Sequence, residues 1–204
     1  MYNTNKEHNI KMEFISNIVN DNEITTAKFL SNDEVKMNLF RRAILSEVET
    51  YTIDIVVFDV NETERHDEII AHRMGQLVID NDLFTPESNE NLIFHMDVVG
   101  PKRVTTNDIQ GLPFKYETFI AELSEDRRLV CDVIVKLGTS KTHVKWRPVA
   151  QFVFEEDQQN GIFNFKFKNI GMLNSEEIIR RAVNKMQISS LREPQTIYSA
   201  FTTQ

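Results

Sequence analysis

The chain has 204 residues, of which 41% are hydrophobic, so it can bury one large core or two smaller ones. Its formal net charge of -8 argues against a surface built mainly to bind nucleic acid, which needs clustered Lys and Arg. One cysteine excludes an internal disulfide and a metal site built from cysteines. The sequence has no apolar run typical of a signal peptide or a membrane span, so we expect a soluble, intracellular protein without membrane contact.

The first third of the chain predicts a hairpin followed by a helix. Apolar and polar residues alternate over residues 10–18 and 23–30, with Asn and Asp between them, which is typical of two paired strands. Ser31 and Glu34 then form a capping-box pattern. Apolar residues recur at helical spacing beyond it, so we expect the first helix over residues 33–48.

The middle of the chain predicts strands and loops around a second helix. Residues 52–60 are mostly β-branched and predict a strand, and residues 64–74 predict a helix that ends at Gly75. Alternation at period two then predicts further strands. These strands cover residues 77–79, 92–98, 129–137 and 142–154.

The last predicted elements are a strand over residues 162–167 and a helix that Asn174 and Glu177 cap. The apolar residues of this helix form one stripe. Elements at the two ends of the chain therefore flank a β-rich middle. We expect an α+β fold, in which a discontinuous domain made of a sheet and two helices carries an inserted β-rich domain.

Arg41 and Arg42 lie in the middle of an otherwise apolar helix. Successive helical residues diverge by about 100°, so the two side chains cannot face the same way. Uncompensated burial of a guanidinium is costly, so at least one of them should point out of the fold toward an acidic group. We expect that group to belong to another protein, with solvated charges and an anion clamp as the alternatives.

Four blocks of sequence occur in the same order as in one known family. They are residues 38–51 (NLFRRAILSEVETY), 67–79 (DEIIAHRMGQLVI), 142–150 (THVKWRPVA) and 171–179 (GMLNSEEII). The four blocks resemble the assembly subunit of multisubunit DNA-directed RNA polymerases, in register across roughly residues 22–188. That family comprises bacterial alpha, its archaeal counterpart and the eukaryotic third-largest subunit.

The resemblance implies a dimerisation domain made of residues 1–52 and 161–204, with an insert domain of residues 53–160 between them. It further implies a heterodimer with a smaller, alpha-like polymerase subunit. The first and last helices each carry an apolar stripe that such a partner can bury. The residues expected in this interface are Leu39, Phe40, Ala43, Ile178, Ile179, Ala182, Val183 and Met186.

The family also implies contact with the second-largest, β-like polymerase subunit, through the helix face that carries Arg42. The residues expected there are Asn38, Arg41, Arg42, Lys145, Trp146 and Arg147. Small zinc-binding polymerase subunits are further candidate partners, and DNA would be reached only through the complex. The subunit would itself be non-catalytic and act at the site of transcription, whether nucleus, cytoplasm or virion.

A basic stripe follows the predicted strand over residues 142–154. Lys141, His143, Lys145 and Arg147 alternate with other residues, which places them on one face of a strand. A protein interface centred on Trp146 is one interpretation, since Trp and Arg are enriched at interface centres. Contact with nucleic acid is a second, and a plain solvated face with Trp146 in the core is a third.

Metal and nucleophile candidates are weak. Glu68 and His72 share a helix face at i and i+4, but no third ligand accompanies them and His66 lies off that face. Cys131 lies in an apolar run, as a core thiol does. Many members of the family carry a cysteine cluster in the insert domain, and this sequence has none between Asp80 and Pro113.

We therefore expect no cofactor and no metal. The insert domain should instead depend on an apolar core of Val133, Val135, Val144, Trp146, Val149 and Phe152. The missing cluster and the compact length are compatible with a reduced polymerase of cellular or viral origin. The alternatives are an unrelated α+β interaction module and a metal-dependent hydrolase that uses Glu68 and His72.

Overall fold

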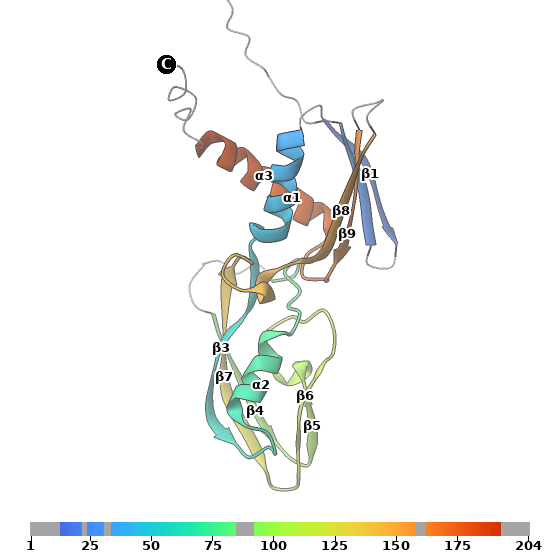
Figure 1. Cartoon of the computed structure of the whole chain (residues 1–204). Coiled ribbons are helices and arrows are strands. Elements are labelled where there is room, and N and C mark those ends of the chain that lie inside the picture. Colours follow the sequence, from blue (N-terminus) through green and yellow to red (C-terminus); the bar gives the residue numbers. More distant parts are fainter. Residues whose placement is uncertain (1–12, 22–23, 31–33, 85–91, 158–161, 193–204) are drawn as a thin grey trace, which may run out of the picture.

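The computed structural model describes residues 13–21, 24–30, 34–84, 92–157 and 162–192. Within these residues the chain forms three antiparallel sheets and three α-helices, which confirms the predicted α+β class. The elements make two lobes stacked end to end (Figure 1).

The upper lobe is a four-stranded sheet with two helices on one face. Its strands lie in the order β1 (Glu13–Asp21), β2 (Ile24–Leu30), β9 (Ile162–Asn169) and β8 (Val149–Asp157), and its helices are α1 (Glu34–Ser46) and α3 (Ser175–Arg192). Alternate residues of a strand face the same side, which directs Phe163, Phe165 and Phe167 of β9 toward the helices. Phe165 stacks on Phe29 at a centroid distance of 5.1 Å and meets Phe40 of α1 edge-on at 5.4 Å.

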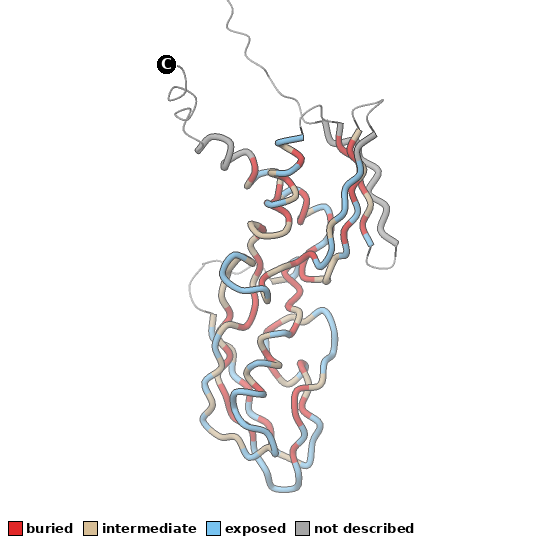
Figure 2. The backbone as a smooth tube through the Cα atoms, in the orientation of Figure 1, coloured by how far each residue is buried: buried red, intermediate tan, exposed pale blue. Residues whose placement is uncertain are grey.

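The lower lobe has its own core. Its main sheet has the order β3 (Thr50–Asn61), β7 (Arg128–Gly138), β4 (Leu92–Val99), and α2 (Asp67–Gly75) packs on it together with the pair β5 (Lys102–Thr105) and β6 (Phe119–Leu123). Cys131 of β7 is fully buried there, and burial raises the pKa of its thiol to about 12. It is a core thiol and not a nucleophile. Figure 2 shows buried residues running along the inside of each lobe.

The prediction of one strand over residues 142–154 was wrong. Residues Val144–Trp146 form a 3-10 helix, η2, and the strand β8 begins only at Val149. The Nδ1 atom of His143 accepts a hydrogen bond of 3.1 Å from the backbone N–H of Lys145, which caps the helix. Pro148 has no N–H to give to a sheet, so pairing starts after it.

Other boundaries also differ from the prediction. The second helix begins at Asp67 and not at residue 64, because Asn61 Oδ1 accepts from the backbone N–H of Thr63 and holds a turn there. Residues 77–79 form no strand beyond a single bridge between Ile79 and Phe114. Strands β5 and β6 were not predicted. The proposed cap residue Ser31 lies outside the described residues.

The predicted domain limit at residues 160 and 161 falls between two paired strands. Strand β8 pairs with β9, and Val149 and Phe152 pack in the upper core rather than with the insert strands. Val144 also leaves the predicted insert core, since 62% of it is exposed. The pairing of β8 with β9 groups residues 149–157 with the upper lobe, so the remaining division into two domains stays a prediction.

The close contact between Gly138 and Trp146 gives a stability prediction. A Cβ atom at Gly138 would lie 2.5 Å from Cε2 of the Trp146 ring, which is buried and donates from Nε1 to Lys136 O at 3.2 Å. We expect Gly138→Ala to lower the free energy of unfolding by about 1–3 kcal/mol in urea melts, because overpacking forces the ring to move.

Gly75→Ala is the matched control for this substitution. The nearest atom to a Cβ at Gly75 is Ile53 O at 3.8 Å, and this glycine ends α2 without a positive φ, so Ala can adopt its conformation. We expect this variant to stay within about 1 kcal/mol of the parent. Equal unfolding midpoints for the two variants would contradict the close packing of Trp146.

Candidate protein-interaction sites

Arg41 and Arg42 diverge on α1, as the helical spacing predicted. Arg41 is half-buried, and its Nε and Nη2 atoms donate to Asn38 Oδ1 at 3.2 and 3.1 Å. Arg42 is exposed, and no described residue forms a side-chain hydrogen bond or an ion pair with it. A guanidinium that keeps its donors unused is available to a carboxylate on another protein.

The basic stripe does not exist as one face. Lys141 forms an ion pair with Glu47 at 2.7 Å, and Lys145 forms one with Asp54 at 2.7 Å. The side chain of Lys145 is only 11% exposed and lies 4.4 Å from the centre of the Trp146 ring. Two of the four predicted basic groups therefore neutralise carboxylates of this same chain, which removes the main support for nucleic-acid contact.

Asp54 holds two lysines at the start of the lower lobe. Its carboxylate contacts Lys145 at 2.7 Å and Lys136 at 3.0 Å. Partial burial raises the pKa of Asp54, but hydrogen bonds and charge from Lys145 and Lys136 outweigh it, so the pKa lies below its usual value. This cluster anchors the segment before β8 to β3, which is a structural role for Lys145.

Trp146 and Arg147 also face inward in part. Trp146 is 5% exposed, so the interpretation that places it in the core fits the structure and an interface centred on it does not. Arg147 is half-buried, and its Nε atom is buried without a partner among the described residues. Thr50 Oγ1 donates to Trp146 O at 2.8 Å, which fixes this segment against the entry to β3.

The residues predicted for dimerisation lie mainly inside the chain. The two helices pack against each other and against the sheet, so the apolar stripes meet within one subunit. The buried members are Phe40, Ala43, Ile178, Ile179, Ala182 and Met186, each at most 6% exposed. Only Leu39 and Val183 stay partly exposed, so a partner has to contact the outer side of the helices.

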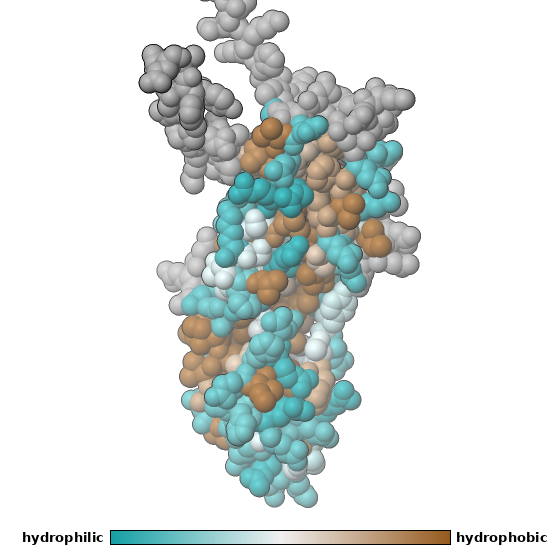
Figure 3. Space-filling view, viewed as in Figure 1, coloured by the Kyte–Doolittle hydropathy of each residue, from teal (hydrophilic) through white to brown (hydrophobic). Residues whose placement is uncertain are grey.

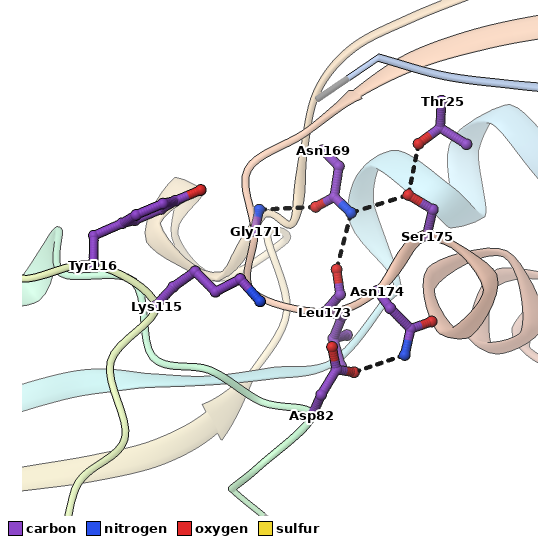
Figure 4. A pocket seen from close by; sticks show the side chains of 9 residues that line it. All are labelled: Thr25, Asp82, Lys115, Tyr116, Asn169, Gly171, Leu173, Asn174 and Ser175. Carbon is purple, nitrogen blue, oxygen red and sulfur yellow. Dashed lines mark hydrogen bonds between the residues drawn. The ribbon is translucent and has the colours of Figure 1, made fainter. Parts of the chain in front are cut away.

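A cavity of about 240 Å³ lies where the two lobes meet, beside the start of α3 (Figure 4). Asn169 links its walls, because its Nδ2 atom donates to Leu173 O at 2.9 Å and to Ser175 Oγ at 3.1 Å. Asn174 Nδ2 donates to Asp82 Oδ1 at 3.0 Å, which joins α3 to the lower lobe. These polar groups form hydrogen bonds with one another and leave no reactive arrangement among the lining residues. We call the residues that line this cavity, together with the neighbouring Asn81, the joint between the lobes.

Asn81 is the central residue of this joint. It is 4% exposed, and its side-chain amide forms the two backbone hydrogen bonds that a neighbouring strand would form with β3. Oδ1 accepts from Tyr51 N at 2.5 Å, and Nδ2 donates to Tyr51 O at 3.2 Å. Its backbone N–H donates to Met172 O at 2.8 Å, in the loop before α3. One residue thus ties β3 to the opposite lobe.

The metal candidates gain no support. Glu68 and His72 lie on α2 at the expected spacing, and no group of three His, Cys, Asp or Glu side chains within the described ranges is placed to hold a metal ion. The expectation of no cofactor and no metal stays a prediction. None of the helices in the described part of the chain is both long and apolar enough to cross a membrane.

The comparison with known proteins decides the family. A sequence profile described as the RNA polymerase Rpb3/Rpb11 dimerisation domain matches residues 36–188, which include most of α1, the whole lower lobe and most of α3. The chain belongs to this family. Membership sets aside the unrelated interaction module and the metal-dependent hydrolase, and it agrees with the four sequence blocks.

Three relatives illustrate the similarity. The chain is 34% identical over 122 residues to the DNA-directed RNA polymerase subunit Rpo3 of Pyrococcus furiosus, a match that covers 54% of this chain and 47% of the relative. It is 29% identical over 150 residues to Rpo3 of Methanocaldococcus jannaschii, covering 72% and 76%. It is 26% identical over 156 residues to the DNA-directed RNA polymerase II subunit RPB3 of Schizosaccharomyces pombe, covering 60% and 52%.

The chain spans about half the length of the Pyrococcus furiosus and Schizosaccharomyces pombe relatives that it matches. The profile match over residues 36–188 contains the helices and strands of the upper core other than β1 and β2, apart from the first residues of α1 and the last residues of α3. The match therefore covers most of the family's dimerisation fold in this chain, including the Arg41–Arg42 helix.

No signal in the sequence marked the polar residues of the joint. Asn81 and Asp82 follow a short apolar run in a loop, and Arg181 stands on a helix surface among other charges. The Nη1 atom of Arg181 donates to Glu49 O at 2.8 Å, which holds α3 to the link between α1 and β3. Only Asn174 was foreseeable, and its Oδ1 does accept from Glu177 N at 2.8 Å as a cap.

Glu177 gives a pH prediction. Hydrogen bonds from Arg180, opposed by partial burial and helped by Arg181, lower the pKa of Glu177 from 4.5 to about 2. A carboxyl group whose pKa is lowered in the folded state adds stability above its unfolded pKa, and this stability is lost as the pH falls through the folded value. We expect acid unfolding to be less steep between pH 4.5 and about 2 in Glu177→Gln, followed by circular dichroism.

Glu176→Gln is the control for this titration, because Glu176 is exposed and forms no ion pair with a described residue. It should keep the acid limb of the parent chain. If both variants unfolded with the parent slope, Glu177 would not be the group that links α3 to acid stability.

Proposed function

We propose that this chain is a non-catalytic assembly subunit of a multisubunit DNA-directed RNA polymerase. The observation that carries the proposal is the match of the Rpb3/Rpb11 dimerisation domain over residues 36–188. The names of the relatives, which are Rpo3 and RPB3 polymerase subunits, support the same assignment. In this role the subunit binds other polymerase chains, and catalysis resides in the large subunits.

The first partner in this proposal is a smaller subunit of like fold, as the Rpb11 part of the family description suggests. Because the inner faces of α1 and α3 are buried within the chain, the contact falls on outer residues. Val35 and Leu39 lie at i and i+4 on α1, so they share a helix face. Val35 is 70% exposed, and Figure 3 shows apolar side chains gathered over the upper part of α1 and over β8.

Co-expression tests this partner. We expect the 204-residue chain and a smaller alpha-like subunit from the same source to elute together and to sediment as a 1:1 complex, because the pair covers apolar surface that is exposed in the single chain. The complex should melt at a higher temperature than either chain. Separate sedimentation of the two chains at micromolar concentration would sink the proposal.

The second partner is the second-largest polymerase subunit, bound through Arg42 and its neighbours on α1. Arg42 is exposed without a described partner, which suits an interface ion pair, whereas Arg41 is held by Asn38. The small zinc-binding polymerase subunits remain candidate partners of the same assembly. DNA contact is indirect in this proposal, which fits the net charge of -8 and the internal pairing of Lys141 and Lys145.

Arg42→Ala tests the second contact. We expect the small heterodimer to form normally and the capture of the second-largest subunit to weaken by about 2–5 kcal/mol, because truncation leaves an acidic partner unpaired. Affinity measured by titration of the purified heterodimer reports this change. Arg41→Ala is the matched control and should change the affinity less, and equal loss of both complexes in Arg42→Ala would show that Arg42 supports folding instead.

A further inference from the structure

Strand β3 forms one edge of the main lower sheet, where its only described neighbouring strand is β7. Its pairing with β7 shifts register between Ile53 and Ile55 and again between Phe58 and Val60. Residues 55–58 between these two shifts (IVVF) are regularly paired on one side only. Figure 1 shows β3 on the left flank of the lower lobe, running down from the end of α1.

This edge lacks the features that usually protect a free strand. Residues 55–58 contain no Lys and no Pro, and none of the described side chains bonds to their backbone. The opposite edge strand β4 differs, because its His95 forms a hydrogen bond with Asp132 and its Asp97 forms an ion pair with Arg128. At Tyr51 the chain caps the β3 edge itself with the Asn81 amide, so the edge accepts strand-like hydrogen bonds.

An apolar row on the outer face of the sheet ends at the same edge. Ile93 of β4 and Ile55 of β3 both lie opposite Ile134 of β7, so the three side chains cross the sheet in one line. Ile55 is 43% exposed, Ile93 is 63% exposed, and the nearby Val57 is 48% exposed. Figure 3 shows apolar side chains on this flank of the lower lobe. One more apolar residue beyond β3 would extend the row.

A hollow of about 400 Å³ lies on the other side of the edge, between β3 and α2. Val56, Val57, Phe58 and Ala71 supply its apolar wall, and Asp67 and Glu68 supply its acidic rim. Both acidic side chains are exposed in the first turn of α2. A side chain with an aliphatic stem and a basic head would fill such a hollow and reach the rim.

The charge around the hollow favours a basic occupant. Residues 59–68 hold five carboxylates and one guanidinium, that of Arg65, which gives a net charge of -4 with His66 neutral. Asp67 accepts a hydrogen bond of 2.6 Å from Asn61, and Glu62 accepts one of 2.7 Å from Arg128 N, so these carboxylates are held in place. His72 stands one turn after Glu68 on α2.

We propose that the β3 edge at residues 55–58 binds an extended segment of a partner protein as an added strand. The segment alternates apolar residues, which continue the row at Ile55, with basic residues, which enter the hollow and meet Asp67 and Glu68. Backbone hydrogen bonds to β3 supply part of the affinity, and the two rows of side chains fix its register. This surface lies in the lower lobe, so it is independent of the dimer proposed above.

A synthetic peptide, acetyl-TVKVRVT-amide, tests the proposal on the 204-residue chain, alone or in complex with its smaller partner. We expect saturable binding by fluorescence polarisation, with amide chemical-shift changes confined to residues 55–58 and 67–71. The charge-inverted peptide acetyl-TVEVEVT-amide should bind at least about tenfold more weakly, because it meets a net negative rim. Higher salt should weaken the first peptide.

Two N-methylated versions of the peptide test strand addition without any change to the protein. Methyl groups on alternate residues block the N–H groups of one edge only. One version should lose binding at least about tenfold and the other should keep it, whereas equal binding of both would overturn strand pairing. Absence of binding at about 1 mM peptide, or shifts mapped elsewhere, would overturn the whole proposal.

Glu68→Lys tests the acidic rim, and Glu125→Lys on the exposed turn between β6 and β7 is the matched control. Both variants change the net charge by the same amount, so a general charge effect would weaken binding equally. We expect a loss of at least about tenfold for Glu68→Lys alone. Equal losses would show that the peptide follows net charge and not this site.

Discussion

The amide of Asn81 forms hydrogen bonds to both backbone groups of Tyr51, while its own N–H binds Met172 in the other lobe. Each lobe has a separate hydrophobic core, so apolar burial alone does not set the angle between them. Polar contacts do this, and they are directional. Because Asn81 is 4% exposed, loss of its partners would leave buried polar groups unsatisfied. The surfaces of both lobes therefore depend on this joint for their relative position.

The upper core explains which residues remain for partners. Phe29, Phe40 and Phe165 contact one another across β2, α1 and β9, so the helix stripes are filled by the chain's own sheet. A surface helix of any globular domain shows such a stripe. On the outer side of α1, the exposed Val35 and the half-buried Leu39 lie near the exposed Arg42.

The segment before β8 shows why linear charge patterns can mislead. Its alternation suggested a strand with one basic face, but a 3-10 turn redirects the side chains. Lys145 then lies over Trp146 and against Asp54, which is 91 residues away in sequence. The contact between Lys145 and Asp54 secures the segment to β3. The charge of Lys145 therefore stabilises the fold of this chain.

Several elements could be predicted because their signals are local. Asn174 and the apolar spacing after it predicted α3, the alternating phenylalanines predicted β9, and the helical angle separated Arg41 from Arg42. The order of the elements predicted the α+β class, and the family blocks predicted the assembly role. Periodicity and capping need only neighbours along the chain, which is why these predictions were possible.

The residues that each side chain contacts depend instead on the three-dimensional fold. Whether the stripe of α1 faces a sheet of its own chain or another subunit depends on where β9 lies, more than 100 residues later in the sequence. The same holds for Lys145 with Asp54, for Asn81 with Tyr51 and for the free edge of β3. These contacts join residues that are distant in sequence, so no local pattern records them.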